Sequence, residues 1–186
     1  TLTNFRVLCA SNNNITNLSP LADLSQLTFL NINGNQINNI SPLSSLTKLQ
    51  TLALVNNQIN NIDALSPLTN LTELTLLLNQ IVNVDSLGNL INLKNLDLSM
   101  NLITDVTALG KLTGLSNLRL VRNKLVDVSP LSTISGSELL DLNDNPTMSC
   151  TGLEQLISTL GSPPVNININ RQDSDVAENG VNCTNM

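Results

Sequence analysis

The stretch LTELTLLLNQIVNVDSLGNLIN, residues 71–92, is one full copy of a phrase that returns every 22 residues. The phrase is Leu-x-x-Leu-x-Leu-x-x-Asn-x-Ile-x-x-Ile-x-x-Leu-x-x-Leu-x-x. A fixed period of this length indicates a repeat architecture, in which each unit packs only against its neighbours. Full units begin at residues 5, 27, 49, 71, 93 and 115, and partial units lie at residues 1–4 and from residue 137.

The apolar spacing within a unit predicts its local structure. The Leu-x-Leu segment alternates apolar and polar residues, which is typical of a strand with one buried face. Strands of successive units are expected to stack about 4.8 Å apart. The return segment has an apolar residue at every third position, which favours short 3₁₀ turns over long α-helices. Proline, which suits a turn start better than a strand interior, recurs there in Ser19-Pro20, Ser41-Pro42 and Ser129-Pro130.

Asparagine occupies the ninth position of every unit. A side-chain amide both donates and accepts hydrogen bonds, so it can satisfy backbone groups where the chain bends after a strand. We interpret these residues as a buried structural ladder, with a polar binding stripe as the alternative. The ladder comprises Asn13, Asn35, Asn57, Asn79, Asn101, Asn123 and Asn145.

In this register the chain resembles the leucine-rich repeat family, over residues 1–145. The 22-residue unit is that of the class shared by bacterial internalins and the regulatory subunit of protein phosphatase 1. The resemblance implies an α/β fold: a right-handed solenoid of β-strands and 3₁₀ turns, whose parallel sheet lines a concave face. In this family the concave face is the usual ligand surface.

The C-terminal segment, residues 146–186, departs from the repeat. Apolar residues at helical spacing predict a helix over residues 151–160, with Thr151 as its N-cap and Glu154 completing a capping box. Alternation of apolar residues with asparagine predicts one last strand over residues 165–169. We expect this helix and strand to cap the open end of the core, as solenoids require.

Composition argues against several classes of function. The chain has 8 Lys and Arg against 14 Asp and Glu, so we expect no nucleic-acid partner. Histidine, the commonest general base, is absent, and 3 dispersed cysteines are too few for a zinc site. No apolar run approaches the roughly 20 residues of a membrane span. We expect a monomer that is not an enzyme and has no cofactor or metal.

Cysteine usage bears on the compartment. Cys150 and Cys183 both lie in the C-terminal segment and could form a disulfide, which would imply an extracellular, periplasmic or cell-surface protein. The alternative is free thiols in a cytoplasmic protein. Cys9 occupies an outward strand position and is expected to be unpaired. Because the chain opens within a repeat, we also expect upstream units, a cap or a targeting segment.

The positions left free by the repeat point outward from the strands. Apolar side chains gathered there mark partner sites, although scattered surface residues or an oligomer contact would look similar. Asp97, Arg119 and Asp141 share one register position and are expected to pair with one another, as are Arg122 and Asp144. The candidate partner-binding residues are Phe29, Val55, Glu73, Leu77, Leu78, Met100 and Val121.

The sequence therefore predicts a non-catalytic protein-binding module that uses the concave face of a repeat solenoid, in a secreted or surface protein of a bacterium. Two alternatives remain at this point. One is an intracellular scaffold or phosphatase regulator, and the other is the targeting region of a larger enzyme.

Overall fold

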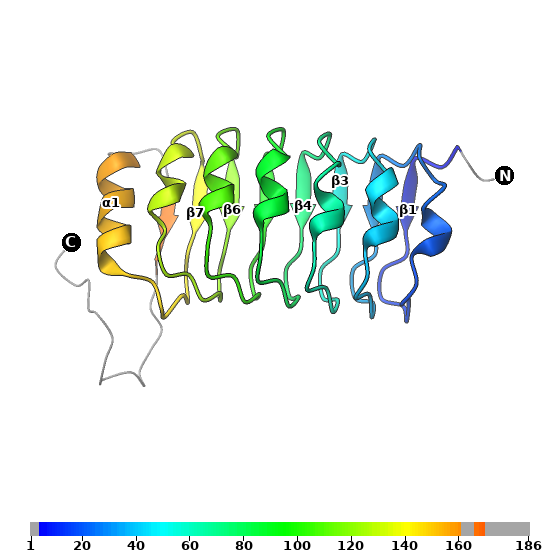
Figure 1. Cartoon of the computed structure of the whole chain (residues 1–186), viewed down its shortest axis with the longest axis horizontal. Helices are drawn as coiled ribbons and strands as arrows, with labels where there is room; N and C mark the ends of the chain where they lie inside the picture. Colours follow the sequence, from blue (N-terminus) through cyan, green and yellow to red (C-terminus); the bar gives the residue numbers. More distant parts are fainter. Residues whose placement is uncertain (1–3, 161–165, 170–186) are drawn as a thin grey trace.

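The computed structural model describes residues 4–160 and 166–169. One parallel sheet contains eight short strands in chain order, with 3₁₀ helices on the opposite side of the solenoid and α1 at one end (Figure 1). The strands are β1 (Val7–Cys9), β2 (Phe29–Asn31), β3 (Thr51–Ala53), β4 (Glu73–Thr75), β5 (Asn95–Asp97), β6 (Asn117–Arg119), β7 (Leu139–Asp141) and β8 (Asn166–Asn168). The helices are η1 (Ser19–Leu21), η2 (Ser41–Ser45), η3 (Asp63–Leu65), η4 (Asp85–Asn89), η5 (Thr107–Lys111), η6 (Ser129–Thr133) and α1 (Cys150–Leu160).

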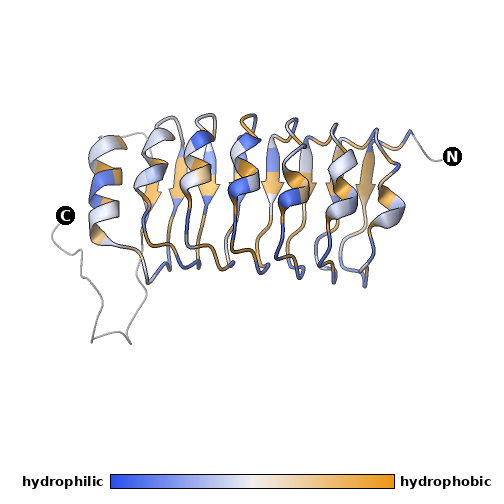
Figure 2. Ribbon diagram, in the orientation of Figure 1, coloured by the Kyte–Doolittle hydropathy of each residue, from blue (hydrophilic) through white to orange (hydrophobic). Residues whose placement is uncertain are grey.

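The predicted strands, 3₁₀ turns and register are confirmed. Each strand from β1 to β6 pairs with the next at a shift of one 22-residue unit, so Leu52 lies beside Leu74 and Leu74 beside Leu96. Leu74 and Leu76 are 2% and 0% exposed, because alternate strand residues point into the core. The apolar residues of the return segment close the core from the other side, and Figure 2 shows them recurring in every turn.

Asparagine side chains link each unit to the one before it. The Oδ1 atom of Asn79 accepts the N–H of Ile59 at 3.0 Å, and its Nδ2 donates to the carbonyls of Leu54 and Leu76 at 2.9 and 3.0 Å. Buried backbone groups that no strand partner reaches are thereby satisfied. The same bonds recur at Asn35, Asn57, Asn101, Asn123 and Asn145. Asn13 is exposed and donates to Ala10 and Ser11 of its own unit.

The predicted C-terminal helix and strand are present, but the predicted helix N-cap is wrong. Helix α1 starts at Cys150, and the hydroxyl of Ser149 accepts the N–H of Gly152 at 3.2 Å. Ser149 therefore caps the first turn in place of Thr151, because its oxygen is the one that meets a free N–H group there. Strand β8 extends the sheet beyond β7.

Helix α1 lies alongside η6 at the end of the solenoid (Figure 1). It buries Leu153 and Leu156 against the last turns, and Ile167 of β8 packs against the same core. The remainder of the proposed cap, residues 161–165 and 170–186, lies outside the described residues.

Cys9 is an exposed free thiol on β1. Cys183 lies outside the described residues, so its pairing with Cys150 stays a prediction. Among the helices of residues 4–160, none has the length and apolar character needed to cross a bilayer.

Candidate functional site

The candidate residues lie on or beside the concave sheet. Side chains at the third and fifth positions of each unit point outward from the strands, and the seventh and eighth positions follow at the strand ends. The third position holds Phe29, half-buried on β2, and Glu73, exposed on β4. The remaining candidates form what we call the apolar row, which contains the half-buried Val55, Leu77 and Val121 and the exposed Leu78 and Met100.

A polar hollow of about 330 Å³ lies on the concave face of β3 to β6. Glu73 lines it, whereas the apolar row borders it at the strand ends, so the structure separates these candidates into two neighbouring surfaces. Sequence reasoning missed most of the polar lining. Their register could have identified them, because they occupy the third and fifth positions of consecutive units. The polar lining residues that were missed are Thr75, Asn95, Asp97, Asn117 and Arg119.

The predicted pairing of Asp97, Arg119 and Asp141 is wrong. The register places the three residues side by side, but the one ion pair among the described residues lies elsewhere. The Oδ1 atom of Asp97 accepts the N–H of Ser99 at 2.9 Å. The short Asp side chain thus bends along its own strand, as is common for Asp near turns. The Arg119 guanidinium is left exposed in the hollow.

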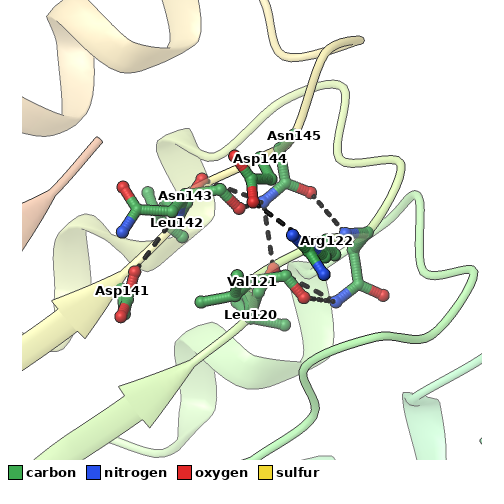
Figure 3. A network of polar contacts seen from close by, with 9 residues as sticks. Leu120, Val121, Arg122, Asp141, Leu142, Asn143, Asp144 and Asn145 are labelled. Carbon is green, nitrogen blue, oxygen red and sulfur yellow. Dashed lines mark hydrogen bonds and ion pairs between the residues drawn. The ribbon is translucent and has the colours of Figure 1, made fainter. Parts of the chain in front are cut away.

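Arg122 and Asp144 form the ion pair predicted for them. The Nε atom of Arg122 lies 3.1 Å from Oδ2 of Asp144 in the next unit, and Figure 3 shows the pair beside the amide of Asn145. The Arg122 side chain is 62% exposed, so water screens this contact and its contribution to stability is small.

The eighth position of each unit has a left-handed backbone. Its φ angles lie between 54° and 62° in all seven units. Gly suits this conformation because it has no Cβ to clash with the backbone. Asn and Asp suit it because their short side chains can hydrogen-bond to nearby backbone groups. Four units have such residues, namely Asn12, Gly34, Asn56 and Asp144. The other three have Leu78, Met100 and Arg122, for which the conformation is strained.

Comparison with known proteins places this geometry in a family. A family model described as leucine-rich repeats (2 copies) matches residues 3–45. The structure of internalin C2 from Listeria monocytogenes is 34% identical, with a TM-score of 0.82, over 90% of this chain and 72% of that one. The chain belongs to the internalin family of leucine-rich repeat proteins.

Two further structures resemble this internalin-family chain. Another Listeria monocytogenes internalin, inlF, is 28% identical with a TM-score of 0.64, over 92% of this chain and 57% of that one. The ectodomain of the Arabidopsis thaliana receptor kinase GASSHO1/SCHENGEN3, in complex with Casparian strip integrity factor 2, is 26% identical with a TM-score of 0.69. That match covers 77% of this chain and 19% of the receptor. A comparison with curated protein sequences found no match.

The internalin-family chain also has one buried hydroxyl with no partner. Ser99 is 5% exposed, and its Oγ makes no hydrogen bond within the described residues. It occupies the seventh position of its unit, between Leu77 and Val121 of the apolar row. A buried polar group without a partner destabilises the fold, so the location of this hydroxyl within the apolar row needs an explanation.

Two acidic side chains in this internalin-family chain accept hydrogen bonds at the start of the return turns. Asp105 accepts the hydroxyl of Thr107 at 2.6 Å and its N–H at 2.8 Å, and these bonds lower the pKa of the Asp105 carboxyl. Asp127 accepts the N–H and hydroxyl of Ser129 in the same way, both at 2.9 Å. Within residues 4–160 and 166–169, no group of three His, Cys, Asp or Glu residues is placed to hold a metal ion.

Proposed function

We propose that this internalin-family protein is a non-catalytic module that binds a protein partner on its concave face. The observation that carries the proposal is the apolar row beside the polar hollow. Leu78 and Met100 remain 40% and 36% exposed, whereas the framework residues Leu76 and Leu98 of the same units are buried. Apolar side chains grouped on a soluble protein commonly mark a partner site.

The two surfaces have complementary tasks in this proposal. The apolar row supplies area that a partner can desolvate, which is the main source of affinity in protein interfaces. The hollow, with Glu73 and Arg119, supplies polar contacts that orient the partner. The plant receptor in complex with Casparian strip integrity factor 2 supports protein recognition by a related repeat.

The absence of histidine supports a role other than catalysis. The two Listeria monocytogenes internalins support a bacterial source. The predicted Cys150–Cys183 disulfide supports an exported or surface location.

A selection experiment tests the proposal without a known partner. A phage-displayed library of random peptides would be selected on the protein, and the affinity of selected peptides measured for a concave variant, Leu77→Asp with Glu73→Lys. We expect a loss of at least about tenfold, the scale of one interface hot spot. The matched control is Ile91→Thr, which replaces an apolar residue that is 63% exposed on another face.

Folding is checked by circular dichroism and urea denaturation. The control substitution introduces the residue that the same position has at Thr47, Thr69 and Thr113, so it preserves the repeat. Unchanged affinity of a folded concave variant would place the binding site elsewhere and overturn the proposal.

A further inference from the structure

Exposed apolar side chains continue past the concave face onto the flank of the solenoid. Nine large apolar side chains are exposed in the described part of the chain, and five of them lie between residues 78 and 126 on the segment that follows the strands. We call these five the rim patch: Leu78, Val82, Met100, Leu102 and Val126. Only Leu78 and Met100 belong to the apolar row.

Backbone hydrogen bonds place the rim patch on neighbouring turns. The N–H of Leu78 donates to the carbonyl of Ser99 at 3.0 Å, which aligns Leu78 with Met100. The N–H of Leu102 donates to Ile81 at 2.9 Å, and that of Val126 donates to Thr104 at 3.3 Å. These bonds place the turns that contain the five exposed residues side by side on one flank of the solenoid.

The repeat itself offers polar residues at these positions. The second and third units have Gly34 and Asn56 at the eighth position, Gln36 and Gln58 at the tenth, and Asn38 and Asn60 at the twelfth. The fourth to sixth units replace several of them with the apolar residues of the rim patch. The change is therefore local to three units and is not a property of the whole solenoid.

Two unfavourable features coincide with the rim patch. Leu78 and Met100 have φ angles of 59° and 56°, a conformation in which Asn or Gly is less strained. The Ser99 hydroxyl, buried without a partner, lies immediately before Met100. Strain and unsatisfied polar groups that persist in a native structure are concentrated at functional sites. This coincidence is an observation independent of exposure, and it supports a binding role for Leu78 and Met100.

The surrounding charge indicates the kind of partner. Asp105 and Asp127 follow the rim patch on adjacent turns and are joined by a parallel bridge. Arg122 pairs with Asp144, and Lys124 is an exposed cation on the same flank. The whole chain has a net charge of −6, so a second copy would bring like charges together. A partner with basic groups around an apolar centre complements this surface.

We infer that the partner reaches over the strand ends and docks on the rim patch through an apolar surface bordered by Lys or Arg, which meet Asp105 and Asp127. The inference rests on the proposed protein-binding function and extends it. It assigns Val82, Leu102 and Val126 to the interface, in addition to the concave residues.

The test uses a rim variant in which the three residues outside the apolar row are returned to the pattern of the repeat: Val82→Asn, Leu102→Gln and Val126→Asn. Peptides selected on the wild-type protein from the phage-displayed random library serve as probes, with Ile91→Thr as the control. We expect the selected peptides to be rich in Lys and Arg beside apolar residues. Their affinity for the rim variant is expected to fall at least about tenfold, and their affinity for the control to stay unchanged.

Three outcomes would overturn the inference. Peptides that bind the folded rim variant as tightly as wild type, while losing affinity for the concave variant, would leave the proposed function standing and exclude the rim. Selected peptides that are acidic would contradict the charge argument. Sedimentation showing that the wild type dimerises and the rim variant does not would identify a second copy as the occupant.

Discussion

Leu78 and Met100 have the same left-handed backbone conformation on neighbouring turns, with φ angles of 59° and 56°, while their side chains remain exposed. The left-handed conformation is unfavourable for both residues, and neither side chain is buried deeply enough to offset that cost. The relationship links the fold to the proposed function, because the bend after each strand presents these two side chains beside the polar hollow.

The strain at Leu78 can be measured against a matched position. Leu102 is 39% exposed and Leu78 is 40% exposed, but only Leu78 has a positive φ. Replacing either by Asn removes a similar apolar contact, whereas Leu78→Asn also relieves about 1–2 kcal/mol of backbone strain. We expect the free energy of unfolding, from urea denaturation, to fall less for Leu78→Asn by about 1 kcal/mol or more. Equal losses would show that the bend is unstrained.

The asparagine ladder predicts a contrast between buried and terminal rungs. Asn79→Ala leaves the N–H of Ile59 and the carbonyl of Leu54 without their bonds of 3.0 and 2.9 Å. Each unsatisfied buried group costs about 1–3 kcal/mol, so we expect a loss of about 3 kcal/mol in urea denaturation. Asn13→Ala, at the exposed first rung, is expected to cost less than about 1 kcal/mol. Similar losses at both positions would rule out the ladder as the cause.

Two buried serines predict opposite responses to removal of the hydroxyl. Ser137 is 1% exposed and donates to Leu115 at 2.9 Å, whereas the Ser99 hydroxyl has no partner within the described chain. We expect Ser137→Ala to destabilise the protein by about 1–3 kcal/mol and Ser99→Ala to leave it unchanged or more stable. Thermal unfolding of the two variants measures these changes in stability. A marked loss of stability in Ser99→Ala would reveal a hydrogen bond that the structure does not contain.

Thiol counting tests the compartment. Cys9 is an exposed free thiol, and we predict a disulfide between Cys150 and Cys183. Titration of the denatured, unreduced protein isolated from its native host is therefore expected to give one thiol per chain. Three thiols would contradict the disulfide and favour the cytoplasmic alternative.

Sequence reasoning was most successful where the repeat dictates the structure. The strands, the 3₁₀ turns and the terminal helix follow from apolar spacing, because only one register buries Leu74, Leu76 and their counterparts. The Arg122–Asp144 pair was also predictable, since both residues occupy the same position in adjacent units.

The candidate site was less accessible to prediction. The sequence positions of Asp97 and Arg119 do not reveal that the Asp97 carboxylate accepts the N–H of Ser99, just after its own strand. Leu102 and Val82 were overlooked because only the third, fifth, seventh and eighth positions were considered as a binding surface, whereas these residues occupy the tenth and twelfth. Comparing them with Gln36 and Asn38 of the second unit would have indicated the change to apolar residues. Backbone φ at Leu78 requires a structure.

The most direct test of the account is methyl NMR of the protein with a library-selected peptide bound. The central claim is that binding occurs on the concave face and its rim. We expect the methyl resonances of Leu77, Leu78 and Met100 to shift on addition of peptide, while those of the distant exposed Ile91 and Ile157 stay unchanged. Shifts confined to Ile91 and Ile157, with none at Leu77, Leu78 or Met100, would contradict it.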